Sequence, residues 1–168
     1  FEKYFHAAEP TQRDKADAWH TAVGLQAVDG LEVSDYLAQT AIRNIEGEIT
    51  FAEADALLQA YYEERPSQGT LDRTEEADKV SMRIATLLSE NAFSFTPNAF
   101  LAIHRRLFEG VYPHAGHIRN YNIAKREWVL DGATVIYGSA TELSATLEYD
   151  IAEERSFSYR GLSMDDTI

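Results

Sequence analysis

At 168 residues, 45% of them hydrophobic, the chain is long enough for one domain with a substantial core. Its formal net charge of −13 argues against a nucleic-acid-binding surface, which needs a stripe of basic residues. The absence of cysteine excludes disulfides, thiol catalysis and thiolate metal sites, and no apolar run approaches membrane-spanning length.

The start of the chain carries no visible signal peptide, and we expect a cytoplasmic protein, with a secreted effector as the alternative. The first residue is phenylalanine and not methionine. We therefore expect the chain to be an excerpt of a longer protein, whose own leader it does not reveal.

Helical periodicity begins near residue 14. It predicts a first helix over residues 14–28, with Trp19 and Ala22 facing inward, and Ser34 is a candidate N-cap for a second helix. The apolar stripe of the second helix consists of Leu37, Ala38, Ala41, Ile42 and Ile45. Both helices are thus expected to bury one face.

A glycine and a capping box separate the second helix from a third. Gly47 lies where a C-terminal helix glycine is expected. Thr50 and Glu53 have the spacing of a capping box, and apolar residues follow at helical spacing as far as Tyr61. The sequence therefore predicts that the second helix ends at Gly47 and that the third begins after Thr50.

Residues 65–69 form the best linker candidate because they combine proline and glycine with polar side chains. We expect an amino-terminal helical unit over residues 1–64 and a second segment over residues 70–168. Further helices are predicted over residues 74–90 and 139–154.

The stretch from residue 95 to residue 137 changes periodicity twice. Thr96 is a candidate N-cap followed by Pro97 at the first helical position, and Gly110 closes the helix. The apolar face of this helix consists of Phe100, Ile103, Leu107 and Phe108. A turn-rich connector over residues 112–116 leads into a strand-like pattern.

A β-hairpin is predicted around Asp131-Gly132, since Asp-Gly between two β-rich runs favours a two-residue turn with positive φ. Such a turn pairs Leu130 with Ala133, Trp128 with Val135, and Arg126 with Tyr137. The opposite face carries Val129 and Ile136, so both faces are apolar and both strand edges are free. No other convincing strand is present in the sequence.

Two interpretations of this hairpin remain open. It is a structural arm packed flat on the helices, or it is a docking edge to which a peptide adds as a further strand. The residues of the candidate docking hairpin are Arg126, Trp128, Val129, Leu130, Thr134, Val135, Ile136 and Tyr137.

Three consecutive segments resemble the amino-terminal half of a Fic domain, the family named for filamentation induced by cyclic AMP. They are IHRRLFEGVY, PHAGHIRNYNIAK and the predicted hairpin. The upstream stretch around NIEGE resembles the inhibitory helix that precedes such domains. The resemblance extends from about residue 22 onward. It implies a mainly α fold, a Fic-like helical bundle with one β-hairpin flap.

The resemblance implies a protein adenylyltransferase, which transfers AMP from ATP and Mg²⁺ to a hydroxyl side chain of a target protein docked on the flap. In this family an inhibitory glutamate lies against an arginine of the active site and obstructs the γ-phosphate of ATP. Glu46-Gly47 matches the end of the inhibitory motif. The preceding Ser/Thr position of that motif is occupied by Ile42, and the nearest hydroxyl, on Thr40, is expected on another face.

No catalytic residue is assigned within these 168 residues. Fic enzymes carry His-Pro-Phe-x-x-Gly-Asn-Gly-Arg, whose residues bind ATP and Mg²⁺ and activate the target hydroxyl, and the sequence contains no such motif. We expect the chain to end before its chemistry. His114 and His117 have a spacing seen in metal sites, but they flank Gly116 without a nearby carboxylate pair, so we expect no metal site.

Residues in the connector resemble the family's path into the flap and are expected to shape the mouth of the site; they are Arg119, Asn120, Asn122 and Lys125. The rival function belongs to another class. It is a non-enzymatic helical module that binds a peptide through the hairpin edge. Neither interpretation involves nucleic acid or a membrane.

Overall fold

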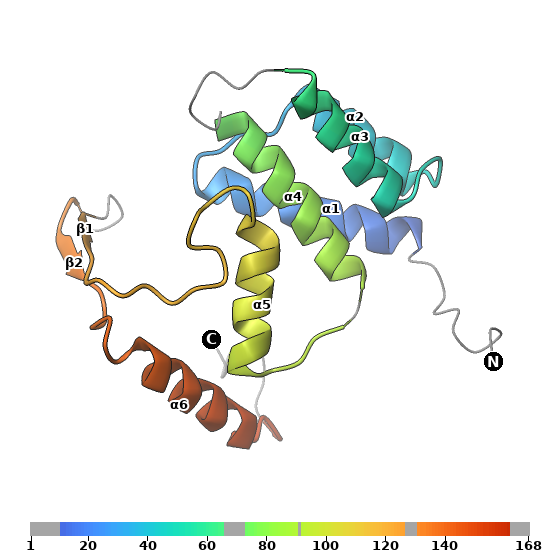
Figure 1. Cartoon of the computed structure of the whole chain (residues 1–168). Helices are drawn as coiled ribbons and strands as arrows, with labels where there is room; N and C mark the ends of the chain where they lie inside the picture. Colours follow the sequence, from blue (N-terminus) through green and yellow to red (C-terminus); the bar gives the residue numbers. More distant parts are fainter. Residues whose placement is uncertain (1–10, 66–72, 91, 127–130, 162–168) are drawn as a thin grey trace. The chain divides into compact units, whose positions relative to one another are not determined.

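The structure is a computed structural model that describes residues 11–65, 73–90, 92–126 and 131–161 (Figure 1). In chain order its elements are α1 (Gln12–Val28), α2 (Asp35–Ile45), α3 (Phe51–Glu63), α4 (Arg73–Ser89), α5 (Pro97–Phe108), β1 (Ala124–Arg126), β2 (Thr134–Ile136) and α6 (Leu143–Ser156). The prediction of a mainly helical chain with one antiparallel hairpin is confirmed for the described residues.

The chain divides into two compact units, Phe1–Ala92 and Phe93–Ile168. In the first unit α4 packs along α1, and α2 and α3 lie side by side (Figure 1). The linker predicted at residues 65–69 falls within this unit, because α4, the helix that follows it, packs on α1. Residues 66–69 themselves lie outside the described part of the chain.

The core of the first unit contains side chains of α1, α2, α3 and α4. Trp19 of α1 stacks on Phe51 of α3, with ring centroids 6.1 Å apart. The buried cluster comprises Trp19, Ala22, Leu37, Ala41, Ile49, Ala54, Leu58, Met82 and Ala85. The inward prediction for Trp19, Ala22 and Leu37 is therefore confirmed.

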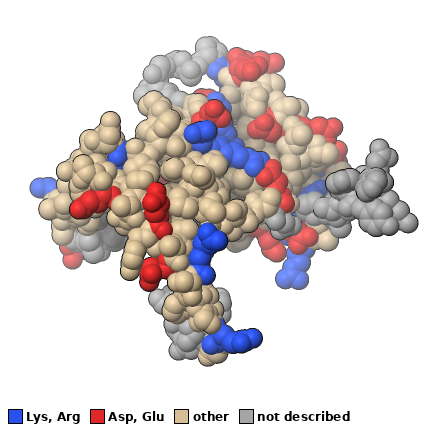
Figure 2. All heavy atoms as spheres, turned by 60° about the horizontal axis from the view of Figure 1, so that its bottom comes forward, with Lys and Arg blue, Asp and Glu red and all other residues tan. Residues whose placement is uncertain are grey.

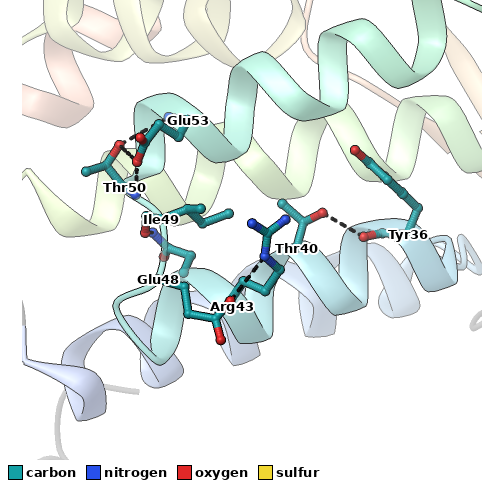
Figure 3. A network of polar contacts seen from close by, with 8 residues as sticks. Tyr36, Thr40, Arg43, Glu48, Ile49, Thr50 and Glu53 are labelled. Carbon is teal, nitrogen blue, oxygen red and sulfur yellow. Dashed lines mark hydrogen bonds and ion pairs between the residues drawn. The ribbon is translucent and has the colours of Figure 1, made fainter.

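The inward face of α2 differs from the predicted apolar stripe. Ala38 and Ile42 are exposed, whereas Thr40 and Asn44 are buried on the inner face. The Thr40 hydroxyl donates to the Tyr36 carbonyl at 2.8 Å (Figure 3), and such satisfied polar groups are readily buried. The prediction was wrong for Ala38 and Ile42 because it counted apolar side chains alone, whereas Thr40 does lie on another face from Ile42, as predicted.

Asn44 joins three segments of the first unit inside its core, and its side chain is fully buried. Its Oδ1 accepts from Nε1 of Trp19 at 3.0 Å, and its Nδ2 donates to the Ile49 carbonyl at 3.0 Å. The ammonium group of Lys15 donates to the Asn44 carbonyl at 3.2 Å. These contacts fix the carboxyl end of α2 against α1 and the start of α3.

Asp78 of α4 holds the other end of α2. Its buried carboxylate accepts from the Ser34 amide at 2.8 Å, the Ser34 hydroxyl at 2.5 Å and the Tyr62 hydroxyl at 2.7 Å. Ser34 also caps α2 as predicted, since its hydroxyl accepts from the Leu37 amide at 3.0 Å. Burial, together with the hydrogen bond to Asp78, raises the pKa of Tyr62, so this phenol remains a donor.

The predicted helix starts are confirmed at two further sites. The Thr50 hydroxyl accepts from the Glu53 amide at 3.2 Å, and the Glu53 carboxylate accepts from the Thr50 amide at 2.7 Å, which completes a capping box (Figure 3). These hydrogen bonds from Thr50 lower the pKa of Glu53. Thr96 caps α5 through the Ala99 amide at 3.1 Å, with Pro97 in the first turn.

Charged side chains of both signs lie among uncharged ones on the face drawn in Figure 2. Two of the ion pairs are Arg43–Glu48 at 3.2 Å, which is exposed, and Glu75–Lys79 at 2.5 Å, which is half-buried. An exposed pair such as Arg43–Glu48 stabilises a fold by only about 0–1 kcal/mol. The buried contacts of Asn44 and Asp78 therefore matter more to the first unit.

The second unit buries less of its apolar surface. Helices α5 and α6 contact one another, and Val111 and Ile151 are buried. On the predicted apolar face of α5, Ile103, Leu107 and Phe108 are half-buried, whereas Phe100 is 55% exposed. This unit contains the connector and the hairpin.

Replacing Asn44 with alanine is expected to lower the free energy of unfolding of the first unit by about 2–4 kcal/mol. The substitution leaves the indole N–H of Trp19 and the carbonyl of Ile49 buried without partners, and each such group costs about 1–3 kcal/mol. Urea unfolding followed by helical circular dichroism measures the change. Gln39→Ala, on the exposed face of the same helix, is the matched control, and equal stability of the two variants would contradict this role of Asn44.

Candidate functional site

The carboxyl end of α2 has a fixed backbone geometry. Glu46 is the C-cap, and Gly47 follows with φ of 81°. The Gly47 amide donates to the Asn44 carbonyl at 3.1 Å, and the Glu48 amide donates to the Arg43 carbonyl at 2.9 Å. This is a Schellman motif, in which glycine is favoured because φ is positive. The predicted place of Gly47 is confirmed.

The Glu46 side chain is exposed at this helix end. The nearest basic residue on the helix, Arg43, pairs instead with Glu48 at 3.2 Å (Figure 3). Among the described residues Glu46 makes no side-chain hydrogen bond or ion pair. Its carboxylate is therefore available to a cation outside this contact network.

The hairpin has a different register from the predicted one. The observed partners are Ala124 with Ile136, Lys125 with Val135, and Arg126 with Thr134. The predicted pairing of Arg126 with Tyr137 was therefore wrong by three positions. Asp131 and Gly132 do have positive φ, of 52° and 79°, as predicted. Of the predicted hairpin residues, Trp128, Val129 and Leu130 lie outside the described part of the chain.

The base of the hairpin supports this register. The Arg119 guanidinium donates to the carbonyls of Tyr121 and Gly138, at 2.5 Å each. The Asn122 side chain accepts from the Ala140 amide at 2.8 Å. These contacts, Arg119 with Gly138 and Asn122 with Ala140, join the two chain segments below the strands and stabilise the observed pairing.

The register also determines which backbone groups face outward. The Tyr137 amide donates to the Ile123 carbonyl at 3.2 Å. Hydrogen-bonded and non-hydrogen-bonded pairs alternate in an antiparallel ladder, so Lys125 and Val135 bond to each other. The amides of Thr134 and Ile136 therefore point away from β1. Ile136 is 85% exposed, which leaves this edge accessible within the second unit.

A close contact joins the connector to α5. The Gly116 amide donates to Nδ1 of His104 at 2.8 Å. Gly116 has φ of 75°, and a Cβ atom there would lie 2.6 Å from Cβ of Arg105. The sequence analysis did not identify His104 as a contact of the connector. The run Tyr-Pro-His-Ala-Gly after the helix was the one available signal of this contact.

Rings gather around His104. It lies 5.0 Å from Phe108 and 6.2 Å from His114, and His114 stacks on Tyr112 at 5.3 Å, measured between ring centroids. Burial, and to a lesser degree the charge of His114, lowers the pKa of His104 below its ordinary value. At neutral pH the ring is uncharged, with Nδ1 accepting from Gly116 and the proton on Nε2.

A groove of about 330 Å³ lies between α5, the connector and α6. Its walls are mainly apolar, with Leu147 of α6 among them, and its polar lining residues are His104, His117, Arg119, Thr146 and Asp150. The volume is at the lower end of the range of small-molecule sites, about 300–1,000 Å³. An apolar side chain or ring suits this lining better than a phosphate group does.

The structure brings some predicted residues together and leaves others apart. Arg119 and Asn122 meet at the hairpin base, whereas Asn120 and Lys125 are exposed beside it. Within the described ranges, no three histidine, aspartate or glutamate side chains gather closely enough to hold a metal ion. None of the described helices combines the length and the apolar character required to cross a membrane.

Comparison with known proteins gives no relative from which a function can be transferred. No protein-family model matches the chain, and neither a curated protein nor a solved structure is similar to it.

Replacing Gly116 with alanine is expected to loosen the connector from α5. The left-handed backbone costs a residue with Cβ about 1–2 kcal/mol, and the added Cβ would also lie 2.8 Å from Nε of Arg105. Hydrogen exchange of the backbone amides of residues 111–118 should then be about tenfold faster or more.

Gly138→Ala is the matched control, because its Cβ would meet only Cδ2 of Leu143 at an ordinary 3.7 Å. Unchanged exchange in Gly116→Ala would show that the contact with Arg105 and His104 does not hold the connector.

Proposed function

We propose that this chain is the restraining and target-holding part of a Fic-type protein adenylyltransferase, which transfers AMP from ATP to a hydroxyl group of a target protein. The observation that carries the proposal is the resemblance of IHRRLFEGVYPHAGHIRNYNIAK, with NIEGE upstream, to that family. The order of a helix (α5), a connector and a hairpin in the second unit agrees with the order in a Fic domain.

The transfer step is not assigned to any residue of this chain. ATP and Mg²⁺ would be held by the family's His-Pro-Phe-x-x-Gly-Asn-Gly-Arg motif, which these 168 residues lack. The experiments below therefore concern the longer protein in which this chain is joined to such a motif. The chain's own residues restrain the nucleotide site and position the target.

The restraint is proposed to come from Glu46. Its exposed carboxylate, without a partner among the described residues, is suited to bind an arginine that would otherwise hold the γ-phosphate of ATP. The Schellman turn at Gly47 and the buried side chain of Asn44 hold this helix end in one geometry. A carboxylate on a fixed backbone competes with a phosphate at a lower entropic cost than one on a mobile backbone.

The hairpin is proposed to bind the target as an added strand. The outward amides of Thr134 and Ile136 supply the main-chain donors for such pairing. A non-enzymatic module that binds a peptide through the same edge is the second candidate, and the 85% exposure of Ile136 favours it equally. Only labelling by AMP separates these two functions.

Replacing Glu46 with glycine in the longer protein is expected to raise AMP transfer, self-modification included. Freeing the arginine for the γ-phosphate restores a charge-assisted hydrogen bond of about 1.5–3 kcal/mol, which corresponds to roughly tenfold to a hundredfold in activity. Incorporation of label from α-labelled ATP measures the effect.

Glu64→Gly is the matched control, because Glu64 is the exposed C-cap of α3, with φ of −74° and ψ of −12° against −70° and −9° at Glu46. Equal activity of the two variants would remove the inhibitory role from Glu46 and leave α2 as scaffold.

Replacing Thr134 with proline is expected to abolish modification of the target while the hairpin survives, because the lost amide points away from β1. Val135→Pro, by contrast, removes a donor between the two strands and should open the hairpin. Thr134→Ala keeps the amide and serves as the control.

Circular dichroism and melting establish that each of these variants is folded. Undiminished target modification by a folded Thr134→Pro protein would exclude strand addition at this edge of β2.

A further inference from the structure

The connector of the second unit is joined to α5 through a ring whose hydrogen-bonding capacity changes on protonation. The Gly116 amide is buried and donates to Nδ1 of His104 at 2.8 Å. A neutral imidazole accepts a hydrogen bond at the nitrogen without a proton, whereas both nitrogens of the charged ring are donors. A charged His104 would therefore place Nδ1–H against the Gly116 amide, two donors without an acceptor between them.

This hydrogen bond differs from two others of the connector because it reaches back into the helix. The Tyr112 amide donates to the Phe108 carbonyl at 2.9 Å and the Ala115 amide donates to the Tyr112 carbonyl at 3.2 Å, so these bonds hold the start of the connector and shape its turn. The bond from Gly116 spans twelve residues and lies three residues before Arg119, which joins the base of the hairpin. Its loss would free the connector where it leads into the hairpin.

Charged and titratable groups of three elements lie around the His104 ring. Among the described residues they are Arg105 on α5, His114, His117 and Arg119 in the connector, and Asp150 on α6. The acidic Asp150 favours a charged ring, and the basic groups oppose it. Burial of the ring, followed by the charge of His114, lowers the pKa of His104 below its ordinary value.

The direction of this shift makes the contact dependent on pH. In the held form the ring resists protonation, whereas in a released connector it is open to water and takes the ordinary pKa of about 6.5. The released form therefore binds the proton more readily, and its share grows as the pH falls below about 6.5. Above that pH both forms are neutral, and the contact has its full strength.

We propose that the hydrogen bond between Gly116 and His104 is a pH-sensitive latch, which holds the connector on α5 while the ring is neutral and releases it when the ring is protonated. The inference does not rest on the proposed function, because the donor, the acceptor and the groups around them all belong to the second unit. Mild acid should therefore loosen the attachment of the hairpin to α5 while the helices of the first unit stay folded.

Hydrogen exchange of the Gly116 amide, measured by NMR on the 168-residue chain at pH 7.5 and pH 5.5, tests the latch. Each rate is divided by the intrinsic rate of that amide at that pH. An ordinary imidazole is about nine-tenths protonated at pH 5.5, so opening should rise several-fold, to at most about tenfold. The amides of α3 are the internal reference, because the lowered pKa of its capping residue Glu53 keeps that cap charged at both pH values.

Two substitutions of His104 separate the acceptor from its titration. His104→Asn places a carbonyl oxygen close to the position of Nδ1, where it accepts from Gly116 at either pH, and should make the opening independent of pH. His104→Gln places its oxygen nearer to Nε2 and should leave the connector open at both pH values. His114→Phe and His117→Asn are the matched controls for the neighbouring imidazoles, and both should keep the rise in acid.

An NMR titration of the unaltered chain does not depend on the folding of any variant. The signals of the His104 ring and of the Gly116 amide should move together, with one shared midpoint. A Gly116 signal that stays constant while His104 titrates, or that follows His114 or His117, would overturn the latch.

The exchange data can also overturn it in three ways. These are equal exchange of Gly116 at both pH values, a rise in acid that His104→Asn retains in full, and an equal rise at the α3 amides, which would indicate general unfolding. A pH-dependent Gly116 in the unaltered chain, a pH-independent one in His104→Asn and unchanged α3 amides would together support the latch.

Discussion

The first unit depends on one buried side chain, the carboxamide of Asn44. It satisfies the indole of Trp19 on one side and the carbonyl of Ile49 on the other, and so ties α1, α2 and the start of α3 together. A buried amide of this kind has a demanding geometry, because any displacement leaves polar groups unpaired at a cost of about 1–3 kcal/mol each. Its consequence for function is a carboxyl end of α2 that is held in one position.

The opposite end of α2 is held by a second buried group. Asp78 binds both the amide and the hydroxyl of Ser34, and it reaches Tyr62 at the end of α3. Helix α2 is therefore fixed at both ends by polar contacts, in addition to the burial of Leu37 and Ala41 along its length. This arrangement leaves the outer side of the helix exposed, and the proposed restraint of the nucleotide site would use its carboxyl end at Glu46.

The hairpin follows a similar logic in the second unit. Arg119 and Asn122 join its two segments below the strands and so stabilise the observed register. The register in turn decides that the amides of Thr134 and Ile136 face outward. A prediction from the turn residues alone does not give this register, because Arg119 and Asn122, which join the two segments, lie outside the two strands.

The sequence predicts well those features that depend on near neighbours in the chain. Caps at Ser34, Thr50 and Thr96 and the C-terminal glycine at Gly47 follow from local hydrogen bonds and backbone geometry.

Features that depend on distant partners were missed. The burial of Asn44 and Asp78 needs Trp19 and Ser34, which lie 25 and 44 residues away along the chain. The exposure of Ile42 follows from that burial, since the polar residues occupy the inner face of α2. Of the candidate site, the sequence therefore supplied Glu46 and the outer strand β2, but neither the exposure of Ile42 nor the register of the hairpin.

The central claim is AMP transfer, and the position of the label in ATP tests it most directly. The longer protein is incubated with a cell lysate, which supplies the target, and with ATP labelled at either the α- or the γ-phosphate. The account predicts protein-bound label from α-labelled ATP alone, and none from either nucleotide with the 168-residue chain by itself. Label from γ-labelled ATP alone, or robust labelling by the 168-residue chain, would contradict it.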